Sequence, residues 1–302
     1  MRLLNHAGRA VLEAGDQGLD VGIASGGAYG PDPQALFADW PEFVAWAGAA
    51  LAEPSAPGAS VLIDEAKLGS PVPRPPQVFA VGLNYRSHAE ETGMPAATGM
   101  PLTFTKFPSS ITGPYSDLVL TGASVDWEVE LVAVIGRPGR HIPADRAWKH
   151  IAGLTVGQDF SDREVQLAGS PPQFSLGKSF PGFSPLGPAL VTPDEFDHLN
   201  DLALLCSVNG ETVQEGNTAQ MIHPVAELVS LLSAVCPLGP GDIVFTGTPD
   251  GVGMGRVPPR YLAPGDVVVS EITGIGRIEQ HCVAPEASGG TAASGGTAGA
   301  AS

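Results

Sequence analysis

The segment 125–132 reads Val-Asp-Trp-Glu-Val-Glu-Leu-Val, an alternation of acidic and apolar side chains that is typical of a β-strand. On such a strand Glu128 and Glu130 point to one side, while the apolar residues between and beyond them pack on the other. Paired carboxylates on a stiff strand can bind a hard cation. The alternative is an amphipathic strand whose polar face simply meets water.

Two downstream segments favour the cation site. Asp159 follows Gly157-Gln158, and Lys178 stands in the glycine-bounded turn Gly177-Lys178-Ser179. Three acids and a lysine then need one common explanation.

Composition favours a β-rich globular protein. The 302 residues allow one large domain or two, and 43% of them are hydrophobic. Gly 39 and Pro 29 are high numbers for a helical protein, so we expect many short strands joined by turns.

The charge balance excludes some partners. Lys+Arg 15 against Asp+Glu 32 gives a net charge of -17, which repels nucleic acid and anionic membranes. An anionic substrate would need local positive charge from a metal, Lys106, Arg163 or Lys178.

Cysteines and hydropathy indicate an intracellular chain. Cys206, Cys236 and Cys282 form no CxxC or CxxH spacing, so neither disulfides nor a zinc site is indicated. The N-terminus lacks the apolar region of a signal peptide, and no apolar run approaches the roughly 18 residues of a membrane span. We therefore expect buried thiols and a cytoplasmic location.

Four regions follow one another along the chain. We expect a small α+β module over 1–70, a proline-rich connector over 71–77, a β-rich catalytic domain over 78–285 and a disordered Gly/Ala/Ser/Thr tail over 286–302. Helices are predicted over 41–51 and 224–234, the second with Pro224 at its first helical position. Asn209-Gly210 predicts a two-residue hairpin turn. The predicted strands are 78–81, 125–135, 189–191, 202–208, 243–246 and 267–272.

A histidine and a glutamate in residues 84–91 could form a proton-transfer pair. Ser87 and Glu90 have the spacing of a helix cap, and His88 and Glu91 then lie on one face of the same helical turn. A carboxylate there can orient an imidazole and raise its basicity. A solvated surface pair is the alternative. Because residues 85–100 are rich in glycine and proline, we expect a lid.

Further candidates occur near a second predicted helix cap, Ser161 with Glu164. Arg163 and Gln166 project from that helix and suit recognition of a carboxylate, although both could be ordinary surface residues. Residues 246–253, Thr-Gly-Thr-Pro-Asp-Gly-Val-Gly, lack the spacing of a P-loop, and their glycines indicate close backbone approach to a ligand or to another segment.

In order along the chain, these motifs resemble the fumarylacetoacetate hydrolase family, over about residues 78–283. The motifs are Asn84-Tyr85-x-x-His88-Ala89-x-Glu91, Lys106 with Pro108-Ser109-Ser110, Glu128-x-Glu130, Gly157-x-Asp159, Gly177-Lys178-Ser179-Phe180, Asn209-Gly210-Glu211 and Thr246-Gly247-Thr248-Pro249-x-Gly251-Val252-Gly253.

The resemblance implies an α+β, β-rich fold, a mixed β-sandwich or roll with a small N-terminal module, and a homodimer. It implies Mg²⁺ or Mn²⁺, with Ca²⁺ as a further option, held by Glu128, Glu130 and Asp159. The sequence departs from the family pattern at Pro181-Gly182, for example, where many relatives have Asp-Thr. We expect such differences to change which substrate is bound and to leave metal binding intact. The remaining roles it implies are catalysis by His88, Glu91 and Lys178 and substrate binding by Lys106, Arg163, Gln166 and Thr248.

The sequence therefore predicts a hydrolase that cleaves the C–C bond of a 2,4-dioxo acid, such as an acylpyruvate or a fumarylacetoacetate-like compound of aromatic catabolism, through a metal-stabilised enolate. One alternative is a decarboxylase or keto-enol tautomerase of a small oxo diacid, of the oxaloacetate or 2-hydroxyhepta-2,4-dienedioate type. A metal- and ligand-binding protein without turnover is the alternative from another class.

Overall fold

The structure, a computed structural model, describes residues 1–15, 17–52, 56–93 and 99–285. The expected disordered tail and residues 94–98 of the expected lid lie outside these residues. In the described part, no helix is long and apolar enough to cross a membrane.

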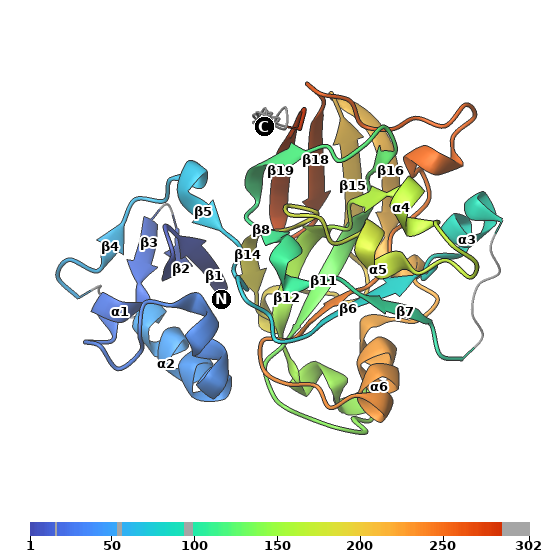
Figure 1. The fold of residues 1–302 in the computed structure, drawn as a ribbon. Coiled ribbons are helices and arrows are strands. Elements are labelled where there is room, and N and C mark those ends of the chain that lie inside the picture. The colour runs from blue at the N-terminus through green and yellow to red at the C-terminus, as the bar shows by residue number, and fades with distance from the viewer. Residues whose placement is uncertain (16, 53–55, 94–98, 286–302) are drawn as a thin grey trace, which may run out of the picture.

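A twelve-stranded mixed sheet forms the centre of the molecule (Figure 1). Its main path runs β4-β3-β2-β1-β14-β12-β11-β17-β6-β7, with β5 beside β1 and β8 beside β14. The strands are β1 Arg2–His6, β2 Arg9–Ala14, β3 Gln17–Asp20, β4 Ser60–Val61, β5 Leu68–Gly69, β6 Val78–Gly82, β7 Leu102–Thr105, β8 Ile111–Thr112, β11 Val129–Ile135, β12 Ile151–Gln158, β14 Ser184–Val191 and β17 Ile243–Phe245.

A five-stranded sheet packs against one face of the first, in the order β16-β15-β18-β19-β9. Asn209 and Gly210 both have positive φ, as the predicted hairpin turn requires, and they join β15 to β16. The strands are β9 Tyr115–Val119, β15 Ala203–Val208, β16 Glu211–Asn217, β18 Val267–Ile272 and β19 Gly276–Val283, with a separate pair of β10 Val125–Asp126 and β13 Ser161–Asp162.

Strand β11 connects the two hydrophobic cores. Its residues Val129 and Leu131 lie in the core shared with the five-stranded sheet, whereas Val132 and Val134 lie in the core on the opposite face. All seven residues of β11 are buried. The expected single strand 125–135 is interrupted at residues 127–128, which separate β10 from β11.

Helices cover both faces of the central sheet. Helix α2 (Trp40–Ala52) packs its buried aromatic residues into the second core, and α6 (Val225–Val235) packs into the first. Pro224 is the N-cap of α6 rather than its first helical residue. The other helices are α1 Val21–Ala24, α3 Arg86–Thr92, α4 Arg163–Gln166 and α5 Phe174–Gly177, with 3-10 turns η1 Pro33–Asp39, η2 Glu65–Lys67, η3 Pro108–Ser110, η4 Ala144–Lys149, η5 Pro193–Glu195, η6 Thr218–Gln220 and η7 Gly253–Gly255.

The first 70 residues share the central sheet with the rest of the chain. Strand β1 pairs with β14 in antiparallel register, Arg2 opposite Val191 and Leu3 opposite Leu190. Residues 71–77 form neither helix nor strand. The α+β, β-rich fold that the sequence predicts is confirmed.

Both predicted helix caps are wrong. Helix α3 begins after Tyr85, which makes no side-chain capping bond, so Ser87 lies inside the helix. Helix α4 is capped by Asp162, which accepts the Val165 N–H, and Ser161 instead donates its hydroxyl to the carbonyl of Asp159. Asp162, which is nearer to the helix start, accepts a free N–H of α4, so the Ser161 hydroxyl can bind the loop backbone at Asp159 instead.

Candidate active site

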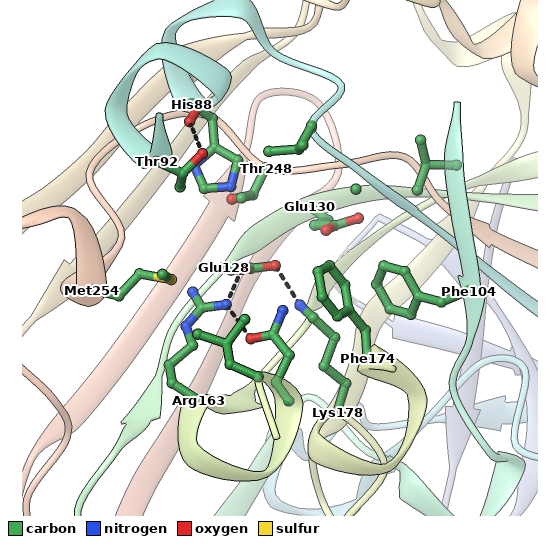
Figure 2. Close-up of a pocket in the computed structure, with 15 residues that line it drawn as sticks. His88, Thr92, Phe104, Glu128, Glu130, Arg163, Phe174, Lys178, Thr248 and Met254 are labelled. Carbon is green, nitrogen blue, oxygen red and sulfur yellow. Dashed lines mark hydrogen bonds and ion pairs between the residues drawn. The ribbon is translucent and has the colours of Figure 1, made fainter. Parts of the chain in front are cut away.

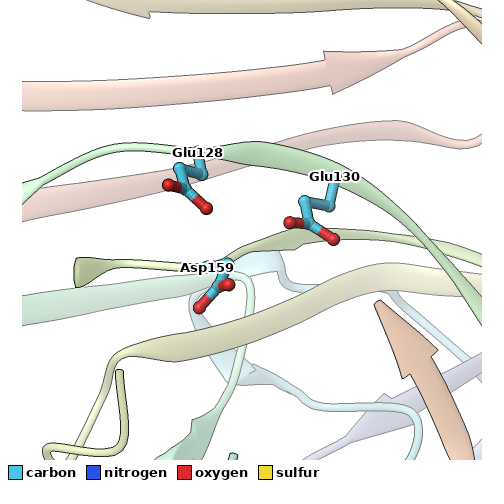
Figure 3. A group of neighbouring side chains, drawn as sticks. All are labelled: Glu128, Glu130 and Asp159. Atoms are coloured by element: carbon cyan, nitrogen blue, oxygen red, sulfur yellow. The ribbon is translucent and has the colours of Figure 1, made fainter. Parts of the chain in front are cut away.

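Strand pairing brings three carboxylates together. Strands β11 and β12 pair with Val129 opposite Gln158, and the Asp159 N–H donates to the Glu128 carbonyl at 2.9 Å. Glu128, Glu130 and Asp159 therefore face one another, with ligand oxygens within 4.8 Å and all three side chains buried (Figure 3). The alternative of an amphipathic strand whose polar face meets water is therefore wrong.

The β11–β12 pair tolerates no side chain at Gly157. A Cβ there would lie 2.6 Å from Val132 and 2.9 Å from Phe245. Next to it, Gln158 accepts the backbone N–H of Glu128 at 2.8 Å and donates to Ser270 at 2.8 Å. These contacts fix the backbone that carries the carboxylates.

Two buried lysines neutralise part of the acidic charge. The Nζ of Lys178 contacts Glu128 at 2.8 Å and Asp159 at 2.7 Å, which leaves one of its three N–H groups for another partner. Lys106 donates to the other oxygen of Asp159 and to the carbonyl of Lys178. Glu130 forms no ion pair in the described part of the chain and accepts only the Gly247 N–H, at 2.7 Å.

The two strand glutamates have opposite electrostatic surroundings. Burial opposes ionisation of Glu128, but the nearby Lys178 and Arg163 outweigh it and lower its pKa to about 2. For Glu130, burial together with the charges of Asp159 and Glu128 raises the pKa well above the ordinary value. Burial also lowers the pKa of Lys106, while Asp159 and Glu128 raise that of Lys178 against the effect of its burial.

The donor set fits a divalent cation. Three carboxylates offer the hard oxygen ligands that Mg²⁺ and Mn²⁺ prefer, and no thiol or imidazole belongs to the cluster. Glu130 lacks a cationic partner among the described residues, and its raised pKa favours the neutral form. A bound cation at this place would favour the ionised form and compensate its buried charge.

Arg163 is held between two acids. It contacts Glu128 through Nη1 at 2.8 Å and Asp126 through Nη2 at 2.8 Å, and it donates to the side-chain oxygen of Gln166 at 2.8 Å. The amide nitrogen of Gln166 is then left to face the cavity. Helices α4 and α5 pack so closely that a Cβ on Gly177 would lie 2.4 Å from the backbone nitrogen of Gln166.

The His–Glu pair on α3 is formed and buried. His88 Nδ1 lies 3.2 Å from Glu91 Oε2, and only 7% of the His88 side chain and 17% of the Glu91 side chain are exposed. Among the described residues no hydrogen bond is found to Nε2 of His88, and the imidazole lines the cavity (Figure 2). The alternative of a solvated surface pair is therefore wrong.

The glycine-rich segment 246–255 binds three acidic residues at the site through its backbone N–H groups. The Gly247 N–H binds Glu130 and the Gly251 N–H binds Glu91 Oε1 at 3.0 Å. The N–H groups of Gly253 and Met254 both bind Asp126, at 2.7 and 2.9 Å. The close backbone approach expected from the sequence is thus made to other segments of the chain.

These groups surround one small cavity between α3, α4, α5 and β11 (Figure 2). Apolar side chains, among them Phe104, Phe174 and Met254, form much of its wall, and His88 lies across it from Glu128 and Lys178. A small anionic molecule would meet cations on one side of a largely apolar pocket and a candidate base on the other.

Seven of the ten predicted site residues line this cavity, whereas Glu91, Asp159 and Lys106 do not. His88, Glu128, Glu130, Arg163, Gln166, Lys178 and Thr248 line the cavity. Lys106 lies behind Asp159 and is fully buried, so it supports the carboxylate instead of reaching a substrate. The Thr248 hydroxyl is already bonded to the Val129 carbonyl and the Gln214 amide, each at 2.8 Å.

The sequence did not single out Asp126 or the apolar wall. Asp126 is fully buried and joins Arg163 to the glycine-rich segment, yet in sequence it is only an acid at a strand end. Phe104 and Phe174 gave no signal, because single aromatic residues are as common in cores as in pockets. The glycines of residues 247–255 were the one sequence feature that indicated the backbone contacts to Asp126.

The chain belongs to the fumarylacetoacetate hydrolase family. The profile of the fumarylacetoacetate (FAA) hydrolase C-terminal domain matches residues 77–283. The human mitochondrial oxaloacetate tautomerase FAHD2A is 47% identical over 211 residues, which are 69% of this chain and 67% of that protein.

Two solved structures extend the comparison. An HpcE-type protein from Mycobacterium smegmatis is 53% identical, with a TM-score of 0.89 over 95% of this chain and 100% of that one. Maleylpyruvate hydrolase from Sphingobium sp. SYK-6, solved with manganese(II) and pyruvate, is 28% identical, with a TM-score of 0.76 over 94% and 99%. The family thus contains hydrolases, isomerases and oxaloacetate tautomerases.

Proposed function

We propose that the protein is a Mg²⁺- or Mn²⁺-dependent keto-enol tautomerase of oxaloacetate or a similar small 2-oxo dicarboxylic acid. The observation that carries this proposal is a single buried His–Glu pair across a small cavity from a carboxylate triad. The 47% identity to a protein named oxaloacetate tautomerase supports it.

Charge in the site supports an anionic substrate that arrives with a metal. Four buried carboxylates, those of Asp126, Glu128, Glu130 and Asp159, face three buried cations, which leaves one negative charge in excess. A bound divalent ion would reverse this sign and supply Lewis acidity to the 2-oxygen and carboxylate of the substrate.

The chain's own groups then carry out the proton transfer. Lys178 has a free N–H for a substrate oxygen, and the Gln166 amide has two. His88 Nε2 would exchange the proton at C3 while a proton leaves or joins the 2-oxygen, so that the double bond shifts and no C–C bond breaks. Glu91 stabilises the imidazolium that forms on His88.

C–C hydrolysis of a 2,4-dioxo acid, which the sequence favoured, is the second candidate. The neighbouring fold of a maleylpyruvate hydrolase supports it. The same His88 would then deprotonate a water molecule directed at the 4-oxo carbon. Decarboxylation uses the same cavity and needs no general base at all, so it gives His88 no role.

The two candidates separate in one assay. Purified protein is freed of metal with chelator, reloaded with Mn²⁺ or Mg²⁺, and mixed with enol-oxaloacetate or with a panel of 2,4-dioxo acids. We expect faster loss of the enol absorbance than with metal alone, with oxaloacetate as the only product by mass. Cleavage of a 2,4-dioxo acid without any effect on the oxaloacetate enol would replace the proposal with hydrolysis.

A further inference from the structure

Glu91 lies directly against a glycine of the turn η7. A Cβ built on Gly255 would be 2.4 Å from both Cγ and Cδ of Glu91 and 2.6 Å from its Oε1. All three nearest heavy atoms therefore belong to the Glu91 side chain, and no backbone atom is among them.

The backbone of Gly255 does not itself require glycine. Its φ lies outside the left-handed region, unlike that of Gly251, which is +99°. Two neighbouring glycines are needed for space against backbone, because a Cβ on Gly251 would be 2.0 Å from the Val213 carbonyl and one on Gly253 would be 1.9 Å from the Arg260 carbonyl. Gly255 differs in that its three nearest atoms all belong to the flexible side chain of Glu91.

The position of Glu91 decides the orientation of the histidine. One carboxylate oxygen accepts the Gly251 N–H at 3.0 Å and the other lies 3.2 Å from His88 Nδ1. Both contacts require the carboxylate to lie in the space that a Cβ on residue 255 would take.

We propose that Gly255 is a positioning residue for the His88–Glu91 pair. Its missing side chain leaves the room in which Glu91 bridges the Gly251 N–H and His88 Nδ1. The bridge holds Nε2 of His88 toward the cavity and keeps α3 closed over it. For catalysis this inference rests on the proposed function, because His88 is there the proton-transfer group.

The test is Gly255→Ala, compared with wild type, with activity measured in the Mn²⁺-loaded enzyme and the NMR spectra recorded with diamagnetic Mg²⁺. Because the added Cβ pushes the carboxylate away, we expect kcat for oxaloacetate tautomerisation to fall by at least about tenfold, while KM and Mn²⁺ affinity change by less than about twofold. The Gly251 amide should exchange its hydrogen about tenfold faster, and the His88 ring ¹⁵N shifts should move.

Two further variants separate this role from a general defect in the turn. Gly30→Ala is the matched control, since a Cβ on Gly30 would meet nothing within 4 Å and the residue is remote from the cavity, so it should change none of these values. In a Glu91→Ala background the clashing atoms are gone. There, Gly255→Ala should lower neither the residual activity nor the melting temperature any further.

An equal loss of stability or activity from Gly255→Ala in both backgrounds would overturn the proposal, because the glycine would then serve the turn itself. Unchanged Gly251 exchange and unchanged His88 shifts would also overturn it. These two spectroscopic readouts need no substrate, so a wild-type enzyme inactive on oxaloacetate would refute the proposed function and leave the positioning role still open to test.

Discussion

At the residue scale, the site is a network of charges that burial makes costly unless each is compensated. Glu128 and Asp159 share Lys178, and Arg163 is shared by Glu128 and Asp126. Glu130 alone among these carboxylates has no ion pair in the described chain, and it is the group that a bound cation would compensate. Glu130 is therefore the carboxylate of this network that is free to bind a metal ion without breaking an ion pair.

Glu130→Gln tests that assignment. The amide keeps the shape of the side chain and leaves every ion pair of the site intact. We expect Mn²⁺ affinity to fall by more than the roughly 10- to 100-fold typical of outer-shell partners, while the stability of the metal-free protein changes little, because the raised pKa of Glu130 already favours its neutral form there. Isothermal titration and thermal unfolding measure the two effects, with the exposed Glu215→Gln as control. Wild-type Mn²⁺ affinity in Glu130→Gln would show that the ion is held elsewhere.

His88→Ala should reduce turnover far more than binding. A general base contributes about 10²- to 10⁴-fold to rate, whereas affinity comes from the cations and the metal. Steady-state kinetics should therefore show a large fall in kcat with KM and Mn²⁺ affinity nearly unchanged. His281→Ala, which removes an exposed histidine paired with Glu279, is the control and should behave as wild type. An unchanged kcat in His88→Ala would remove this histidine from the mechanism.

At the element scale, short helices and turns on strong strands build the site. Helix α3 starts where Asn84 binds the His223 backbone at 2.8 Å and the Thr246 carbonyl at 2.7 Å, and it ends at Gly93 with φ 68°. At the site, α3 contributes His88 and Thr92 to the cavity wall, and Glu91 binds the glycine-rich segment. Such an element is suited to opening and closing over a ligand.

Hydrogen exchange tests the lid that the sequence predicted over residues 85–100. We expect amides of α3 to gain protection when Mn²⁺ and oxalate bind together, since a ligand adds contacts to an element with few of its own. Amides of β11 should not change and serve as the internal reference. Equal protection of α3 with and without ligand would mean that His88 is fixed beforehand.

The N-terminal strands contain an ion pair whose effect depends on pH. Asp20 caps α1 and contacts Arg9 at 2.6 Å, and the hydrogen bond from Arg9 lowers the pKa of Asp20. A lowered pKa adds stability above about pH 4, the unfolded value, and this stability is lost as pH falls through the folded value. Urea unfolding should show that Asp20→Asn costs up to about 1 kcal/mol at pH 7 and less at pH 3. An equal cost at both pH values would contradict the ion pair's role.

At the scale of the whole molecule, the sequence predicted what local periodicity determines. Strand alternation correctly indicated that Glu128 and Glu130 share a face, and Asn209-Gly210 correctly predicted a hairpin. Prediction from the sequence failed where two neighbouring residues could cap the same helix: Asp162 caps α4, and Ser161 does not. Lys106 was misplaced and Asp126 was missed because their partners are 37 or more residues away, and no local pattern reports such contacts. The homodimer and the cytoplasmic location stay predictions.

The central claim is proton exchange at C3 of an oxo diacid without C–C cleavage, and ¹H NMR of oxaloacetate in D₂O tests it most directly. With Mg²⁺-loaded wild-type protein we expect the C3 hydrogens to be replaced by deuterium much faster than in a protein-free Mg²⁺ blank. His88→Ala should bring the rate back to near that blank, and pyruvate should not accumulate beyond it. Pyruvate formation accelerated by the protein, or C3 exchange no faster than the blank, would contradict the account.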